Sequence, residues 1–341
     1  MSAGSFANSF QAFIWKRDRA SAKNNDKSKE MLTRRSAVAS TCAALMPGFA
    51  LRVGPASAQE SRLRAIATFS ILADFVKNVG GDRVDVAALV GPNGNAHVYA
   101  PSPSDARKLA DARVVFVNGL GFEGWLDRLV KASAASAPVI VASKGIKPIE
   151  RSAEGGAAHE HEREHGRADP HAWQSVANAK IYVANVRGAL AAIEPAGKAF
   201  YESNTDRYLG KLDALDREVR DTIAGIPADR RHVITSHNAF GYFQSAYGIA
   251  FTAVQGVSTE SEASAKDVAD IITQIRRDKA AAVFLENVTD PRLVRQIASE
   301  TGAKIGGLLY SDALTDQSGD APTYIDLIRH NVKQLAAALI S

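Results

Sequence analysis

The stretch from residue 194 to residue 226, EPAGKAFYESNTDRYLGKLDALDREVRDTIAGI, decides the fold. Pro195 suits the first turn of a helix, where a backbone N–H is not needed. Apolar side chains then recur at helical spacing and form one stripe, which consists of Tyr201, Tyr208, Leu212, Leu215, Val219 and Ile223. The stripe runs for about eight turns, which is unusually long for one small domain. We therefore expect a single long helix that braces two lobes.

Strands and helices alternate on both sides of this helix. Before it, we expect strands at residues 62–69, 84–90, 114–119 and 138–143, and helices at 70–80, 102–112, 122–132 and 173–193. After it, we expect strands at 231–236, 249–256, 281–287 and 304–310, and helices at 238–248, 264–279, 291–302 and 323–340. The alternation predicts an α/β fold with mostly parallel sheets flanked by helices. The chain would then divide into an N-terminal lobe at 59–193 and a C-terminal lobe at 227–341, joined by one rigid helix at 194–226.

The basic charge of the chain is concentrated in its first 58 residues. They hold nine of the 41 Lys and Arg residues but only three of the 37 acidic residues. The rest of the chain has 32 basic and 34 acidic side chains, which gives a net charge near −2. The overall net charge of +4 is therefore no argument for binding nucleic acid.

Residues 1–58 are typical of an export signal. Arg34 and Arg35 precede a modestly apolar run, as in a twin-arginine signal, and the sequence ASAQE offers a cleavage site after Ala58. Met31 stands where a signal of ordinary length begins, so residues 1–30 are either an upstream start-codon error or a long leader. The alternative interpretation is a disordered tail followed by a short helix.

The mature chain is expected to be soluble and periplasmic. Cys42, the only cysteine, lies inside the apolar run rather than after it, which argues against a lipid anchor. After cleavage no cysteine remains, so the mature chain forms no disulfide and offers no thiolate to a metal. No apolar stretch after Ala58 approaches the roughly 20 residues of a membrane span.

Four potential metal ligands follow strands of the expected sheets, two in each lobe: His97, His171, His237 and Asp312. In open α/β sheets, ligands bind beyond the carboxyl ends of the strands, so two facing lobes would bring these side chains together. Three imidazoles and one carboxylate make a plausible tetrahedral zinc site. Four protein ligands leave no obvious position for a catalytic water, which favours capture over catalysis. Taken singly, each residue has an ordinary alternative as a loop residue, a helix cap or a turn former.

Seven stretches closely resemble the TroA-like solute-binding proteins of zinc and manganese ABC importers: HVYAPSPSD (97–105), VVFVNGLGFEGWLDRL (114–129), DPHAW (169–173), TSHNAFGYFQSAYG (235–248), QGVSTESEASAKDVADI (255–271), VFLENVTD (283–290) and YSDAL (310–314). They occur in the family's order between about Leu63 and Ile340. The resemblance implies two α/β lobes joined by one rigid helix, and a membrane permease as the partner. It also implies four metal ligands, which are His97, His171, His237 and Asp312.

The third ligand position separates subgroups of this family. Manganese-type members commonly carry Glu there and zinc-type members carry His, so His237 points to Zn(II), with Mn(II) as the alternative. Glu260, Glu262 and Glu286 are further candidates, as carboxylates that orient the ligands or balance charge between the lobes. Their alternative role is that of ordinary surface carboxylates.

A histidine-rich segment at residues 155–168, GGAAHEHEREHGRA, precedes the second ligand. Zinc-type members of the family often carry a His- and acid-rich insertion here. Glycines flank His159, His161 and His165, so the segment cannot build a core and is expected to be mobile. Its imidazoles could hold zinc transiently near the cleft as an auxiliary metal loop. The alternative is a solvated charged loop with no metal role.

Together these patterns predict a monomeric periplasmic receptor that captures Zn(II) between its lobes and delivers it to an inner-membrane ABC permease. The same role for Mn(II) is the first alternative. A zinc hydrolase with Glu260 or Glu286 as general base is a second, disfavoured because the chain has no H-E-x-x-H motif. An adhesin is the third, and the missing lipid-anchor cysteine makes surface display less natural. We expect no enzymatic activity.

Overall fold

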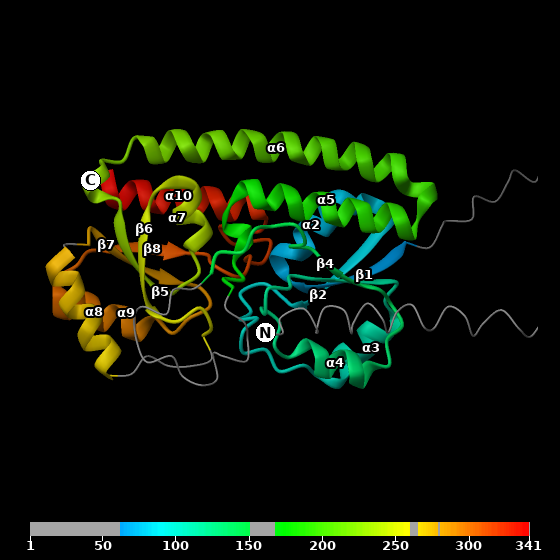
Figure 1. Cartoon of the computed structure of the whole chain (residues 1–341), viewed down its shortest axis with the longest axis horizontal. Helices are drawn as coiled ribbons and strands as arrows, with labels where there is room; N and C mark the ends of the chain where they lie inside the picture. Colours follow the sequence, from blue (N-terminus) through cyan, green and yellow to red (C-terminus); the bar gives the residue numbers. More distant parts are fainter. Residues whose placement is uncertain (1–61, 151–167, 260–264, 279, 341) are drawn as a thin grey trace, which may run out of the picture. The chain divides into compact units, whose positions relative to one another are not determined.

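The first of two sheets contains four parallel strands in the order β2-β1-β3-β4 (Figure 1). Its strands are β1 (Leu63–Phe69), β2 (Val84–Val90), β3 (Val114–Val117) and β4 (Val139–Val141). Its helices are α2 (Ser70–Gly80), α3 (Pro103–Asp111), α4 (Leu126–Ser133) and α5 (Val176–Ile193). All residues of β1 except Arg64 are buried, as expected for an interior strand of a parallel sheet covered on both faces.

This computed structural model describes residues 62–150, 168–259, 265–278 and 280–340. Several predictions from the sequence lie outside these residues. They are the export signal at 1–58, the auxiliary loop with His159, His161 and His165, and the two carboxylates Glu260 and Glu262. No helix among the described residues has both the length and the apolar character needed to cross a membrane.

The second sheet repeats the topology of the first, with four parallel strands in the order β6-β5-β7-β8. Its strands are β5 (His232–His237), β6 (Ala250–Gln255), β7 (Ala282–Glu286) and β8 (Ile305–Leu309). Its helices are α7 (Gly241–Tyr247), α8 (Ala265–Asp278), α9 (Pro291–Thr301) and α10 (Tyr324–Ile340). In both sheets the first strand lies inside and the second at an edge. The predicted α/β fold with two parallel sheets is confirmed.

The long helix between the sheets is α6 (Lys198–Ala224), with 27 residues. The apolar stripe predicted from its sequence is buried throughout. The predicted limits were slightly wrong, because residues Pro195–Gly197 form a 3₁₀ turn and the α-helix starts only at Lys198. The predicted start of the preceding helix at Trp173 was wrong for the same reason: Ala172–Gln174 is a 3₁₀ turn, and α5 begins at Val176.

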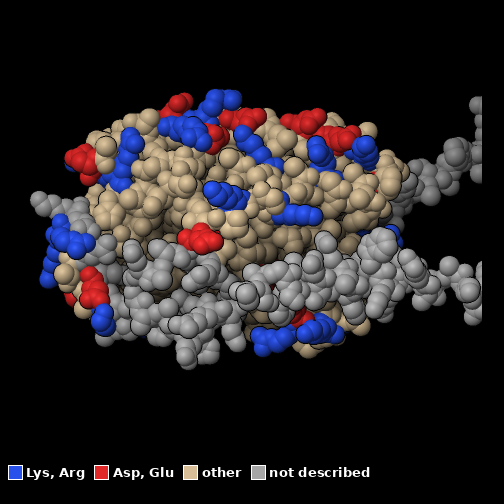
Figure 2. Space-filling view, viewed as in Figure 1, with Lys and Arg blue, Asp and Glu red and all other residues tan. Residues whose placement is uncertain are grey.

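Helix α6 lies along elements of both lobes (Figure 1). It packs against α5 and α2 beside the first sheet and against α10 beside the second. Acidic and basic side chains are intermixed along the outer side of the molecule where α6 lies (Figure 2). The helix also contains the i,i+4 ion pair Asp216–Arg220. Amphipathic burial of one face therefore holds the helix against both lobes. The lobe limits at 59–193 and 227–341 stay a prediction.

Two apolar clusters hold the sheets and helices together. The larger one includes β1 and β3, the buried stripe of α6, most of α10 and parts of β5, β7 and β8, so it is continuous between the lobes. The smaller one lies within the second lobe and consists of Ile234, Val254, Ile272, Ile275, Val283, Val294, Ile297 and Ala298. Helices α8 and α9 thus pack on the second sheet through a core of their own.

Candidate metal site

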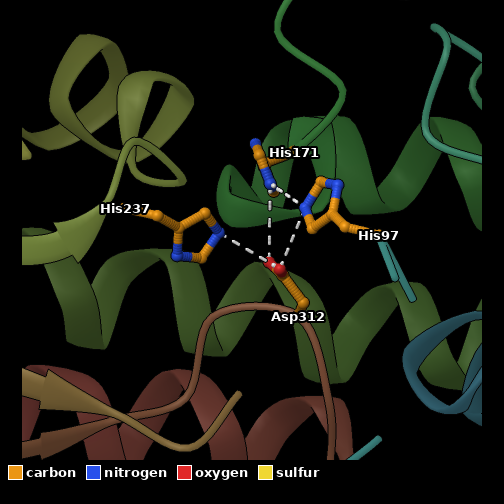
Figure 3. A group of neighbouring side chains, drawn as sticks. All are labelled: His97, His171, His237 and Asp312. Atoms are coloured by element: carbon orange, nitrogen blue, oxygen red, sulfur yellow. Dashed lines mark hydrogen bonds and ion pairs between the residues drawn. The ribbon is translucent and has the colours of Figure 1, made fainter. Parts of the chain in front are cut away.

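The four predicted ligands lie together where chain segments leave the two sheets (Figure 3). His97 is in the loop after β2, and His171 directly precedes the 3₁₀ turn before α5. His237 is the last residue of β5, and Asp312 follows β8 by three residues. All four side chains are buried, and one ligand atom from each lies within 4.8 Å of the others. The sequence therefore selected residues that the fold brings to one point.

Four of the six separations among these side chains are close to the edges of a small tetrahedron. Nε2 of His97 lies 3.2 Å from Nε2 of His171 and 3.3 Å from Oδ2 of Asp312. Asp312 also lies 3.1 Å from Nε2 of His237 and 3.6 Å from Nε2 of His171. A tetrahedral ion with bonds of about 2.0–2.1 Å would have ligand–ligand edges of about 3.3 Å. These four separations are therefore close to those that such an ion requires.

The charges of the site are set by burial and by neighbours. Burial alone would raise the pKa of Asp312, but His237 and His171 outweigh it and hold that pKa well below its usual value. Burial also opposes a charged His237, yet the negative charges of Glu286 and Asp312 raise its pKa well above the ordinary value. At His97 burial dominates and lowers the pKa. Among the described residues, neither carboxylate oxygen of Asp312 accepts a hydrogen bond, which leaves both free to face a cation.

Two of the imidazoles are backed by carboxylates. Oδ1 of Asp169 accepts a hydrogen bond from the backbone N–H of His171 at 2.9 Å and lies 2.8 Å from its Nδ1. Oε1 of Glu286 accepts from the backbone N–H of His237 at 2.9 Å, and Oε2 lies 2.7 Å from Nδ1. Such partners fix the ring so that Nε2 points at the metal position. The predicted carboxylate Glu286 thus lies beside a ligand.

Sequence reasoning missed Asp169. A usable signal was present, because an acidic residue two positions before a ligand can reach both the backbone N–H and the ring of that ligand. It also missed Asn118, whose side chain is fully buried and donates to the carbonyl of Pro170 at 2.9 Å. Asn118 lies in the stretch that resembles the family, but nothing local indicates that its partner is 52 residues away.

His97 is held differently. Its backbone N–H donates to Oδ1 of Asn95 at 3.0 Å, and the carbonyl of Ala96 accepts from Nε1 of Trp125 at 2.8 Å. Among the described residues, no carboxylate lies within ion-pair distance of its Nδ1. The edge of Phe122 packs against its ring, with centroids 4.8 Å apart. Backbone hydrogen bonds and packing therefore orient His97, without a charged partner behind the ring.

The loop that carries Asp312 is bonded to the first lobe. The carbonyl of Ser311 accepts hydrogen bonds from Nε1 of Trp173 at 2.9 Å and Nε2 of Gln174 at 2.7 Å. Two residues beyond Asp312, the backbone N–H of Leu314 donates to Oγ of Ser70 at 2.9 Å. Along the chain, His97 and His171 precede α6, and His237 and Asp312 follow it. By hydrogen bonding, however, the residues on either side of Asp312 also contact the first lobe.

The remaining described histidines lie away from the cluster. Nε2 of His232 is 3.0 Å from the hydroxyl of Thr252, and Nε2 of His330 is 3.0 Å from the carbonyl of Leu308. These contacts occupy Nε2 of both rings within the second lobe. In the part of the chain that the structure describes, no second group of three or more potential ligands gathers.

Two α/β lobes, one long bridging helix and a buried cluster of three His and one Asp define a two-lobed metal receptor. Residues 66–338 match the family described as the zinc-uptake complex component A, periplasmic. The chain belongs to this family, whose members are substrate-binding receptors of metal ABC transporters and not enzymes. The family resemblance found in the sequence is confirmed, and the hydrolase alternative falls away.

Individual relatives cover most of the chain. A manganese ABC transporter substrate-binding lipoprotein, PsaA of Streptococcus mitis, is 30% identical over 83% of this chain and 91% of its own length. The iron-binding protein YfeA of Yersinia pestis is 34% identical over 81% of this chain and 86% of its own. The solved structure of the periplasmic zinc binding protein TroA from Treponema pallidum superposes with a TM-score of 0.73. It is 30% identical and covers 82% of this chain and 99% of its own. Their names include three different metals.

Proposed function

We propose that this chain captures Zn(II) through His97, His171, His237 and Asp312 and passes the ion to an ABC permease of the inner membrane. The observation that carries the proposal is the set of donor separations of 3.1 to 3.6 Å around Asp312. Three imidazole nitrogens and one carboxylate oxygen suit Zn(II), which accepts four ligands without a geometric preference of its own. The buried carboxylates behind two of the imidazoles strengthen those nitrogens as donors.

Mn(II) is the second candidate, because a relative with this fold is named for manganese. The ligand set favours zinc, since manganese prefers oxygen ligands and the described cluster offers three nitrogens to one residue with oxygen. Elemental analysis of the protein purified from its own cells would identify the metal it carries. Competition titrations with both metals would then rank them. Purified protein loaded with manganese and a preference for manganese in competition would overturn the zinc assignment.

The ligand assignment is tested by calorimetric titration of metal-free protein. His171→Ala should abolish tight binding of Zn(II), because it removes one of four donors and leaves Asp312 facing a void. His232→Ala is the matched control, because its imidazole is hydrogen-bonded in the same protein but lies outside the cluster. Equal zinc affinity of the His171 and His232 variants would show that the metal binds elsewhere.

The accessory parts of the proposal concern residues outside the described structure. We propose that residues 1–58 direct export to the periplasm, with cleavage near Ala58, and that the mature receptor acts as a monomer. We also propose that His159, His161 and His165 collect zinc for the site. Deleting residues 159–165 should slow growth in zinc-starved medium, whereas the affinity of the tight site for zinc should change little. An unchanged growth rate would remove the collecting role.

A further inference from the structure

One side chain joins a metal ligand of the first lobe to two loops of the second. Oδ1 of Asn95 accepts a hydrogen bond from the backbone N–H of His97 at 3.0 Å. Its Nδ2 donates to Oγ1 of Thr259 at 2.8 Å and to the carbonyl of Val288 at 2.9 Å. Thr259 follows β6 and Val288 follows β7, so both partners belong to the second lobe. The acceptor end of this carboxamide therefore serves the ligand, and the donor end serves the opposite lobe.

A neighbouring asparagine pair places the same loop firmly against the second lobe. Nδ2 of Asn287 donates to Oδ1 of Asn93 at 3.2 Å and to the carbonyl of Ala313 at 3.3 Å. The backbone N–H of Asn93 donates to the carbonyl of Leu314 at 2.8 Å. Asn93 adopts φ +55°, a left-handed conformation that asparagine tolerates better than most residues. These hydrogen bonds hold the loop before His97 against the second lobe. Within this loop, Asn95 is hydrogen-bonded both to His97 and to the loops that follow β6 and β7.

His97 is also the ligand closest to solvent. Its exposed fraction is 7%, whereas His171, His237 and Asp312 have none. Each of the other two imidazoles contacts a carboxylate of its own lobe, Asp169 for His171 and Glu286 for His237. His97 is held instead by the neutral carboxamide of Asn95. Of the four candidate ligands, the one nearest to solvent and without a charged partner is the one whose bond to a departing ion can break first.

We propose that Asn95 is a positioning residue that slows metal release. It does so by linking the position of His97 to the position of the second-lobe loops that carry Thr259 and Val288. The proposal rests on the proposed function of the cluster as a zinc site. If His97 withdraws, the loop that carries Asn95 must shift and its bonds to Thr259 and Val288 break. If the loops part, they pull on the residue that orients His97.

A double-mutant cycle on the full chain tests this coupling. Protein loaded with Zn(II) is mixed with excess chelator, and the release rate is followed by stopped flow. Thr259→Val removes one acceptor of Asn95 and should speed release by about threefold. Asn95→Ala removes all three hydrogen bonds and should speed it by roughly tenfold or more. Because both act on one shared bond, the double variant should release zinc more slowly than the product of the two single effects predicts.

A matched control separates this role from general loss of structure. Asn185 is also half-buried and donates two hydrogen bonds to backbone carbonyls, at 2.8 Å each, but both partners lie in the first lobe. Asn185→Ala should leave the release rate unchanged. Far-UV circular dichroism of the metal-free Asn95→Ala and Asn185→Ala proteins checks that both are folded. Strictly multiplicative single effects, or equal acceleration by Asn185→Ala, would each overturn the proposal.

The same measurements distinguish this inference from the function on which it rests. If zinc binding by the unaltered chain does not depend on His171, the proposed site itself is wrong. If binding depends on His171 but Asn95→Ala releases zinc at the wild-type rate, the site stands and the coupling by Asn95 fails.

Discussion

Asp312 and Asp74 are both buried carboxylates, but their surroundings give them opposite charge behaviour. Asp312 faces three imidazoles, and His237 and His171 hold its pKa well below the usual value despite burial. Asp74 lies in α2 and accepts hydrogen bonds from the backbone N–H of Tyr324 at 3.1 Å and the hydroxyl of Tyr208 at 3.3 Å. There burial prevails over these neutral donors and raises the pKa to about 6.

Burial alone therefore does not identify a functional carboxylate. Oxygen Oδ2 of Asp74 accepts from donors on α6 and α10, so this group joins three helices. Within the described structure, Asp312 accepts no such bond and instead shares its space with nitrogens that can face a metal. A buried acid that accepts hydrogen bonds from neighbouring helices, as Asp74 does, has a structural role. A buried acid surrounded by potential ligands, as Asp312 is, marks a candidate metal site.

The largest effect that separates the two carboxylates concerns metal affinity. Asp312→Asn removes the only carboxylate of the cluster seen in the described residues, so zinc affinity should fall on the order of 1000-fold, beyond the roughly 10–100-fold typical of residues behind a ligand. Asp74→Asn should leave zinc affinity within about twofold, because its helix junction does not contact the ligands. Calorimetric titration of both metal-free variants measures the difference. A similar loss in both variants would contradict the distinction drawn between the two acids.

The sequence predicted most of the elements, and it picked out four side chains that the fold brings together, for a physical reason. Buried parallel strands such as β1 are continuous apolar runs, and the stripe of α6 has helical period, so local pattern and burial agree. His97, His237 and Asp312 lie at or shortly after the ends of strands, and parallel strands bring the residues at their carboxyl ends to one edge of the sheet. These features are encoded within a few residues of each position.

Features that depend on distant partners could not be predicted. Asp74 looks like an ordinary polar residue of an amphipathic helix, and only the approach of α10, 250 residues away, reveals its role. The anchoring of Asp312 to the first lobe depends on Trp173 and Gln174, which reach Ser311 from the other lobe. The start of α6 was missed because the 3₁₀ turn at Pro195–Gly197 satisfies the same helical pattern in sequence.

A second test uses the pH dependence of stability. The folded-state pKa of Asp74 lies above its ordinary value, so the folded protein binds this proton more tightly than the unfolded chain does. Its contribution to the free energy of unfolding therefore falls by about 3 kcal/mol as the pH rises from about 4 to above about 6. Asp74→Asn should remove that fall, since the amide imitates the protonated acid. Urea unfolding of the metal-free proteins across this range measures it.

The outcome depends on the difference between the two proteins at each pH, because all other titrating groups are shared. Relative to wild type, the Asp74→Asn variant should gain stability steadily between about pH 4 and about pH 6 and no further above it. A constant difference across the range would mean that Asp74 is not protonated in the folded state. Asp74 would then be negatively charged in the folded protein, as Asp312 is expected to be from its lowered pKa.

The smallest expected effect extends the comparison to Asp169, which touches a ligand and not the metal position. Asp169→Asn keeps an oxygen for the backbone N–H of His171 but removes the negative charge behind its ring. Zinc affinity should fall by about 10–100-fold, clearly less than for Asp312→Asn, because the ring keeps its place but is a weaker donor. Titration of the three Asp→Asn variants side by side ranks them. A loss as large as that of Asp312→Asn would make Asp169 a direct ligand, and no loss would mean that packing alone orients His171.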